Sequence, residues 1–196
     1  LLHTVQKELE FFYPSPFDSS VEEFLIRPED VGETSREEIL LFKEEKNSFE
    51  IGLFIHPKIL DSLAKDSPWE RLHSGNLDSF CAAVEGVSHF LFIMSRLCQQ
   101  RPVSQLELEL QAEVDKYLVC SLLLQRQMKR HALPLLRQAL FEEYSLRKGL
   151  GPEEEIRYHL ASRLAHQYCG RLDKIAHPLR QPDLIQEVRR FRQKGL

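Results

Sequence analysis

The sequence predicts an α+β protein in which a small antiparallel sheet and short helices in the amino-terminal portion pack on a carboxyl-terminal bundle of about four helices. Two short runs of β-branched and aromatic residues, 39–42 and 49–55, indicate a hairpin. After residue 102, capping residues and prolines mark successive helix starts. A chain of 196 residues with 29% charged residues is long enough to bury a core without metal or disulfide staples. We therefore expect an α+β portion, 1–100, and a helical portion, 101–196, that form one compact unit.

The elements before residue 66 are short. Apolar residues at helical spacing predict a helix over 1–12, which two prolines then end. One more helical turn is expected at 21–25, followed by a polar loop over 29–38. Asn47–Ser48 suits the turn of the hairpin, and Pro57 suits the first turn of a short helix.

The segment 79–85 is ambiguous, because short apolar runs suit both a strand and a helix. A two-stranded hairpin alone is marginally stable, so we favour a third strand here. Gly86 would then allow a turn, and Ser88 would cap a helix over 89–99.

From Ser104 onward the pattern is helical. Ser104 and Glu107 form a capping-box motif that opens a helix running to about residue 130. Three further helices are predicted: one from Pro134 to near Gly149, one from Pro152 to near residue 177, and one from Pro182. No strand of five or more residues is expected between 104 and 175.

One carboxylate interrupts an apolar row of the helix that follows Ser104. The row, at steps of four and three, is Leu106, Leu110, Glu113, Tyr117, Cys120 and Leu124. A lone ionised carboxylate would not tolerate such burial, so Glu113 should have a cationic or hydrogen-bonding partner. We expect that partner to be Arg163, His159 or His166.

Four residues are candidates for a catalytic or metal-binding role because they interrupt apolar surroundings: Glu85, His89, Glu109 and Glu113. Carboxylates and an imidazole could hold a divalent metal or divide acid and base roles. The sequence has neither a His-Glu-x-x-His motif nor the Glu-x-x-His spacing of di-iron bundles. We therefore expect no metal and no cofactor, and internal ion pairs are the main interpretation.

Basic residues gather late in the chain. Residues 126–196 have a balance of +7, against −11 for 1–125. The candidate binding residues are His159, Arg163 and His166 on one helix face and Arg189, Arg190 and Arg192, beside Lys194, at the end of the chain. This charge could meet nucleic acid, but neutralising the acidic amino-terminal part requires no further partner, so we favour the second interpretation.

Composition and motifs limit the function classes. No dinucleotide, Walker or nucleophile-elbow motif is present, no secretory signal is recognised, and the longest apolar run, 80–98, is broken by polar residues. The four cysteines match no zinc or redox spacing and suit buried, reduced thiols. We expect a cytoplasmic interaction or regulatory protein with a protein partner, no membrane and no catalysis of its own. A metal-dependent hydrolase or nuclease is the alternative and nucleic-acid binding is the third, so enzymatic activity is left undecided.

Overall fold

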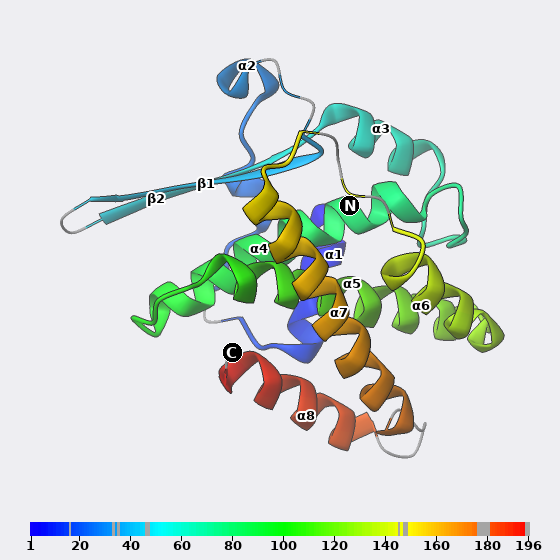
Figure 1. Cartoon of the computed structure of the whole chain (residues 1–196). Helices are drawn as coiled ribbons and strands as arrows, with labels where there is room; N and C mark the ends of the chain where they lie inside the picture. The colour runs from blue at the N-terminus through cyan, green and yellow to red at the C-terminus, as the bar shows by residue number, and fades with distance from the viewer. Residues whose placement is uncertain are drawn as a thin grey trace.

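A protruding hairpin at one end and a group of long helices make up the fold (Figure 1). The computed structural model describes residues 1–15, 17–32, 34, 36–45, 48–144, 146, 149–175 and 181–194. Among the described residues, both strands of the sheet lie before residue 100 and the long helices follow residue 76. This arrangement confirms the α+β prediction.

The hairpin consists of β1 (Glu38–Glu45) and β2 (Ser48–Ile55), which are antiparallel. Ile39 pairs with Phe54 and Phe42 with Ile51. The predicted turn residue Asn47 lies outside the described residues. Near the base of the hairpin, Phe54 and Ile55 are buried, whereas Phe42 and Phe49 farther out are exposed. Only the base of the hairpin therefore contributes to the core.

Short helices surround that base. They are α1 (Leu2–Phe12), the 3₁₀ turn η1 (Val21–Phe24), α2 (Pro28–Val31) and α3 (Pro57–Lys65). The predicted helices at 1–12 and from Pro57 and the turn at 21–25 are confirmed, and Ser20 and Glu23 form a capping box at η1. The predicted loop over 29–38 is wrong in part, because α2 occupies its start and β1 begins at Glu38.

The predicted strand over 79–85 is wrong, because this segment belongs to the 22-residue helix α4 (Leu77–Cys98). This helix packs against α1, α3, α5 and both strands, so it is apolar on nearly every face. Gly86, expected in a turn, lies inside the helix where it passes the hairpin.

By length and composition alone, α4 could cross a membrane, since one 18-residue window has a mean hydropathy of 1.4. The expectation that no apolar run approaches this length was therefore too strict. Of that window, 67% is buried inside the protein, as in the core helix of a globular fold.

The remaining helices follow the capping signals. They are α5 (Gln105–Arg126), η2 (Arg130–Ala132), α6 (Leu133–Phe141), α7 (Pro152–Ile175) and α8 (Gln181–Lys194). Ser104 and Glu107 form the predicted capping box. The helix ends were overestimated in two places: α5 ends at Arg126, before Met128 with its positive φ of 59°, and α6 ends at Phe141 rather than near Gly149. The predicted end of the next helix, near 177, lies outside the described residues.

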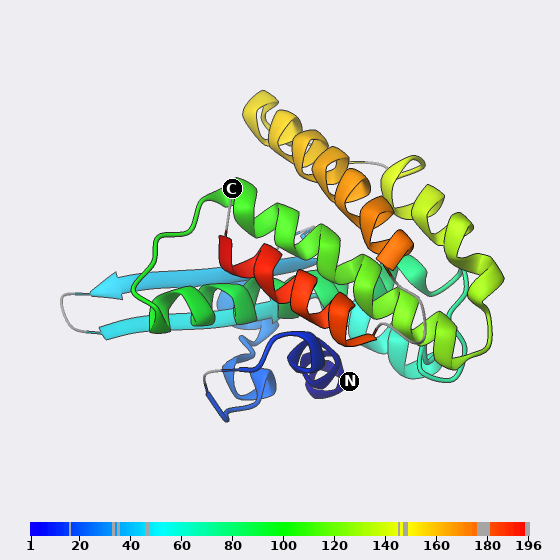
Figure 2. The same cartoon turned by 90° about the horizontal axis from the view of Figure 1, so that it is seen from below.

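The most extensive contacts between helices are those of α5 with α7 and with α4. α8 contacts α1 and α7, and Figure 2 shows it in front of α5 in this view from below. Hydrogen bonds from Arg96 and Arg101 to the backbone of Arg192 and Gln193 join the end of α8 to the end of α4. Phe80 and Phe90 of α4 are fully buried. The α4–α5 pair is thus the centre of the molecule. The polar side chains between these two helices are the candidates for a functional site.

Candidate functional site

His89 is buried between two carboxylates. Its Nδ1 lies 3.5 Å from Glu38 Oε2, and its Nε2 lies 3.6 Å from Glu109 Oε2. The three side chains come from α4, β1 and α5, and His89 is only 4% exposed. Neither His89 Nε2 nor Glu38 Oε2 has a hydrogen-bond partner.

Burial alone would lower the pKa of His89, because it penalises the charged imidazolium. The neighbouring carboxylates of Glu109 and Glu38 outweigh this effect and raise the pKa of His89 well above its usual range. The two carboxylates therefore favour the charged imidazolium over the neutral ring.

Glu85 lies one turn before His89 on α4. Donor atoms of Glu38, Glu85 and His89 all lie within 4.8 Å of one another. Glu85 also accepts a hydrogen bond of 2.9 Å from Lys116 Nζ. Three of the four sequence candidates, Glu85, His89 and Glu109, therefore converge, and they do so together with Glu38.

The fourth candidate, Glu113, lies next to them and pairs with Lys116 Nζ at 2.9 Å. The prediction that its partner would be Arg163, His159 or His166 is wrong. Lys116 lies one turn away on the same helix, and this spacing lets it pair with the carboxylate without a contact from another helix. Burial raises the pKa of Glu113 despite that cation. For Lys116, burial acts to lower the pKa, but Glu113 and Glu85 raise it well above its usual range. We call the residues Glu38, Glu85, His89, Glu109, Glu113 and Lys116 the acidic cluster.

A second buried network surrounds Asp115, on another face of α5. The Asp115 carboxylate accepts hydrogen bonds from Tyr13 Oη at 2.8 Å, Ser88 Oγ at 2.6 Å and Gln111 Nε2 at 2.8 Å. Arg192 Nη1 lies 3.8 Å away. Burial raises the pKa of Asp115 even though Arg192 and these donors favour the ionised form.

The face predicted on α7 makes local contacts. The Tyr144 hydroxyl and His159 Nδ1 are 2.5 Å apart, and His166 Nε2 lies 3.7 Å from Glu142. Arg163 is exposed. The described polar partners of the two histidines thus lie in the segment that follows α6, and neither is Glu109 or Glu113.

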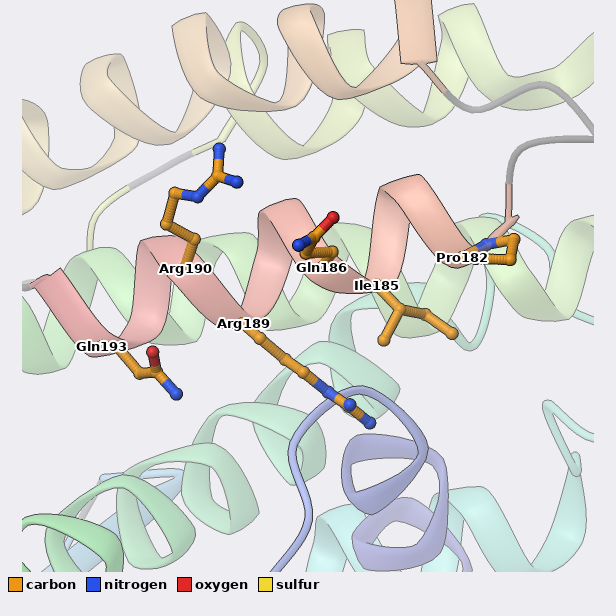
Figure 3. A pocket seen from close by; sticks show the side chains of 6 residues that line it. All are labelled: Pro182, Ile185, Gln186, Arg189, Arg190 and Gln193. Carbon is orange, nitrogen blue, oxygen red and sulfur yellow. The ribbon is translucent and has the colours of Figure 1, made fainter.

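The basic end of the chain does not present one face. Arg189 and Arg190 point to opposite sides of α8 beside a pocket of about 560 Å³ (Figure 3). Arg189 donates to the backbone carbonyl of Phe12, and Arg192 points inward over the Tyr13 ring, 4.3 Å from its centroid. Phe191 stacks on Tyr168, with the ring centroids 4.0 Å apart.

A larger pocket of about 750 Å³ lies over the second half of α5, between α6, α7, α8 and the end of α1. We call it the helical groove. Its apolar lining includes Phe12, Leu118, Leu122, Leu133, Leu172 and Leu184. Three arginines, Arg126, Arg130 and Arg137, and one acid, Asp173, also line it.

Sequence reasoning missed three important residues: Glu38, Lys116 and Asp115. Glu38 was assigned to a loop, and only the folding of β1 onto α4 brings it to His89. For Asp115 a signal exists, because Leu108, Gln111, Asp115, Leu118 and Leu122 form a second row at steps of three and four. Lys116 lies next to that row, and nothing in the sequence marks it as the partner of two carboxylates.

Comparisons with models of protein families, with curated proteins and with solved structures found no match for this chain.

Proposed function

We propose that this protein is an interaction or regulatory protein without catalysis of its own, and that the helical groove binds an acidic amphipathic segment of a protein partner. The observation that carries the proposal is the combination of an apolar floor and an arginine rim in one groove. Amphipathic helices bind other proteins by laying their apolar face into such a groove.

Charge selects the partner. The described groove lining carries three arginines and one acid, and Glu8 beside it adds a second acid, so one positive charge is in excess. Arg126 pairs with Glu8 and Arg137 with Asp173, while Arg130 is exposed at the rim. Acidic residues on the polar face of a partner helix would meet this rim, whereas a basic helix would be repelled.

The alternative, a metal-dependent hydrolase or nuclease, requires an acidic face that opens to a substrate cleft. Of the three pockets of the described structure that we consider, none is lined by the acidic cluster. Glu113 is engaged by Lys116. Nucleic-acid binding through the end of the chain has less support, since Arg189, Arg190 and Arg192 point in different directions.

The four cysteines are unpaired. Cys120 and Cys169 are buried as expected, whereas Cys81 is half-buried and Cys98 is exposed, so the expectation of buried thiols is wrong for these two. Reduced thiols of this kind are typical of a reducing compartment. This supports our proposal of a cytoplasmic location.

Fluorescence anisotropy with labelled 16-residue amphipathic peptides tests the groove. The panel varies the apolar face and carries either glutamates or lysines on the polar face. We expect saturable binding of glutamate peptides only, weakened at least tenfold by Leu133→Glu and by Arg130→Glu. Leu135→Glu is the matched control, because Leu135 is 66% exposed on the same helix and does not line the groove.

Two results would overturn the proposal. The first is equal binding of lysine and glutamate peptides, or binding that Leu133→Glu leaves unchanged. The second is displacement of a bound dye by dodecanoate with no peptide bound, which would make the groove a site for small amphiphiles.

A further inference from the structure

We propose that Glu38, Glu85 and His89 bind a divalent transition-metal ion, Zn²⁺ or Mn²⁺, with Glu109 as a positioning residue behind His89. This inference concerns a different face of α5 from the helical groove and does not depend on the proposed function. It also revises the expectation, from sequence alone, that no metal is bound.

The geometry supplies a ligand set. The three donor atoms lie within 4.8 Å of one another, a spacing that a small contraction around one ion would close to coordination distances of about 2.0–2.2 Å. Glu85 and His89 lie one turn apart on α4, so the helix fixes two ligands, and β1 supplies the third. Glu85 also contacts Lys116, but a carboxylate has two oxygens and can serve two partners.

An independent observation points to a ligand at this position. Glu38 Oε2 is buried and lies 3.5 Å from Nδ1 of His89, yet it has no hydrogen-bond partner. His89 Nε2, on the other side of the buried ring, has none either and faces Glu109. Buried polar atoms without partners destabilise the folded state, so native structures seldom keep them. A cation held between Nδ1 and the carboxylate of Glu38 would provide a partner for the Glu38 oxygen.

Glu109 fits the role of an outer carboxylate. With the metal on Nδ1, the proton of His89 is on Nε2, which faces Glu109 Oε2 at 3.6 Å. A metal-bound histidine commonly donates its other N–H to a carboxylate, which fixes the ring and its tautomer. Binding would exchange the second imidazole proton for the ion, so the released proton goes to solvent.

Charge and donor type narrow the identity of the ion. Among the described residues, four carboxylates, those of Glu38, Glu85, Glu109 and Glu113, gather around one lysine and one histidine. This excess of negative charge favours a divalent cation. A mixed set of carboxylates and one imidazole suits Zn²⁺ or Mn²⁺, whereas Mg²⁺ and Ca²⁺ prefer oxygen ligands alone. The bound ion would tie the hairpin to α4.

Thermal melts of chelator-treated protein, titrated with Zn²⁺, Mn²⁺, Mg²⁺ or Ca²⁺, test the site. An ion that binds only the folded state raises its melting temperature in a saturable way. We expect Zn²⁺ or Mn²⁺ to do so with one ion per chain by calorimetry, and Mg²⁺ and Ca²⁺ to have little effect at the same concentration. His89→Gln and Glu38→Gln should abolish the rise. His131→Gln and Glu50→Gln, which change exposed residues, should keep it.

Absorption of bound Co²⁺ gives a second readout that does not depend on melting, and Glu38→Gln serves if His89→Gln fails to fold. Nitrogen and oxygen ligation should give visible bands without the strong near-ultraviolet band of thiolate ligands. No saturable shift with any ion, a shift that survives both substitutions, or a thiolate band would overturn the proposal.

Discussion

The guanidinium of Arg192 lies 3.8 Å from the fully buried carboxylate of Asp115, so the last helix of the chain is joined to the middle of α5 by a charge pair in the interior. The same guanidinium lies over the rings of Tyr13 and Phe92, at 4.3 and 5.2 Å from their centroids. A basic residue of segment 126–196 therefore neutralises an acidic residue of segment 1–125, as the charge asymmetry predicts.

Arg192→Ala should destabilise the protein strongly, because it leaves the carboxylate of Asp115 buried without its cation. We expect a loss of about 3 kcal/mol or more in the free energy of unfolding, measured by urea denaturation. Arg190→Ala is the matched control, since Arg190 is exposed and pairs only with Glu187 on its own helix among the contacts described. Equal losses in the two variants would show that the Arg192 pair contributes nothing special.

Asp115 should make stability depend on pH in a defined direction. Burial raises its pKa in the folded state, so the native protein binds more protons than the unfolded chain between pH 3.8 and the folded pKa. Across that window this group contributes more stability as the pH falls. The melting temperature of the parent minus that of Asp115→Asn should therefore increase as the pH is lowered from neutral towards 4. A difference that stays constant or shrinks would contradict the raised pKa.

Lys116 should be the most sensitive residue of the acidic cluster. Lys116→Met leaves the carboxylates of Glu85 and Glu113 facing each other in a largely buried site, whereas Glu113→Gln leaves Lys116 with Glu85. We expect a loss of about 3–5 kcal/mol for Lys116→Met and a smaller loss for Glu113→Gln. Chemical denaturation at neutral pH without added metal measures both. A larger loss for Glu113→Gln would show that Lys116 depends on Glu113 alone.

Gly86 tests how closely α4 approaches the hairpin. Helix propensity alone predicts that Gly86→Ala stabilises α4 by about 1 kcal/mol. A Cβ at this position, however, would lie 2.5 Å from Ile55 Cδ1 and 3.2 Å from Leu53 Cδ1. We therefore expect a net loss of about 1–2 kcal/mol from overpacking. Ile55→Val, which removes the closest atom, should reduce that loss in the double variant, and additive effects of the two substitutions would refute the contact.

Local signals predicted much of the fold. The capping box at Ser104 and Glu107, the proline at the start of α7 and the β-branched runs of the hairpin act through neighbouring backbone groups, so they can be read from the sequence. Helix ends were less well predicted. α5 ends just before Met128, which adopts a positive φ, but the residue there is not the glycine by which such a position is usually recognised. The strand predicted over 79–85 failed for a different reason: a short apolar run suits a strand and a helix alike, and only the contacts of α4 with the hairpin and with α1, α3 and α5 show why this segment is apolar.

For the candidate site, the sequence by itself determined which side chains are ionisable within apolar surroundings: Glu85, His89, Glu109 and Glu113. The tertiary structure decided their partners. Glu38 reaches His89 because β1 packs on α4, and Arg192 reaches Asp115 because α8 returns to α5. Burial and charge pairing depend on distances between segments far apart in the chain. Residue spacing fixes such distances only within one helix or strand, so the contacts across elements were settled by the packing of the whole fold.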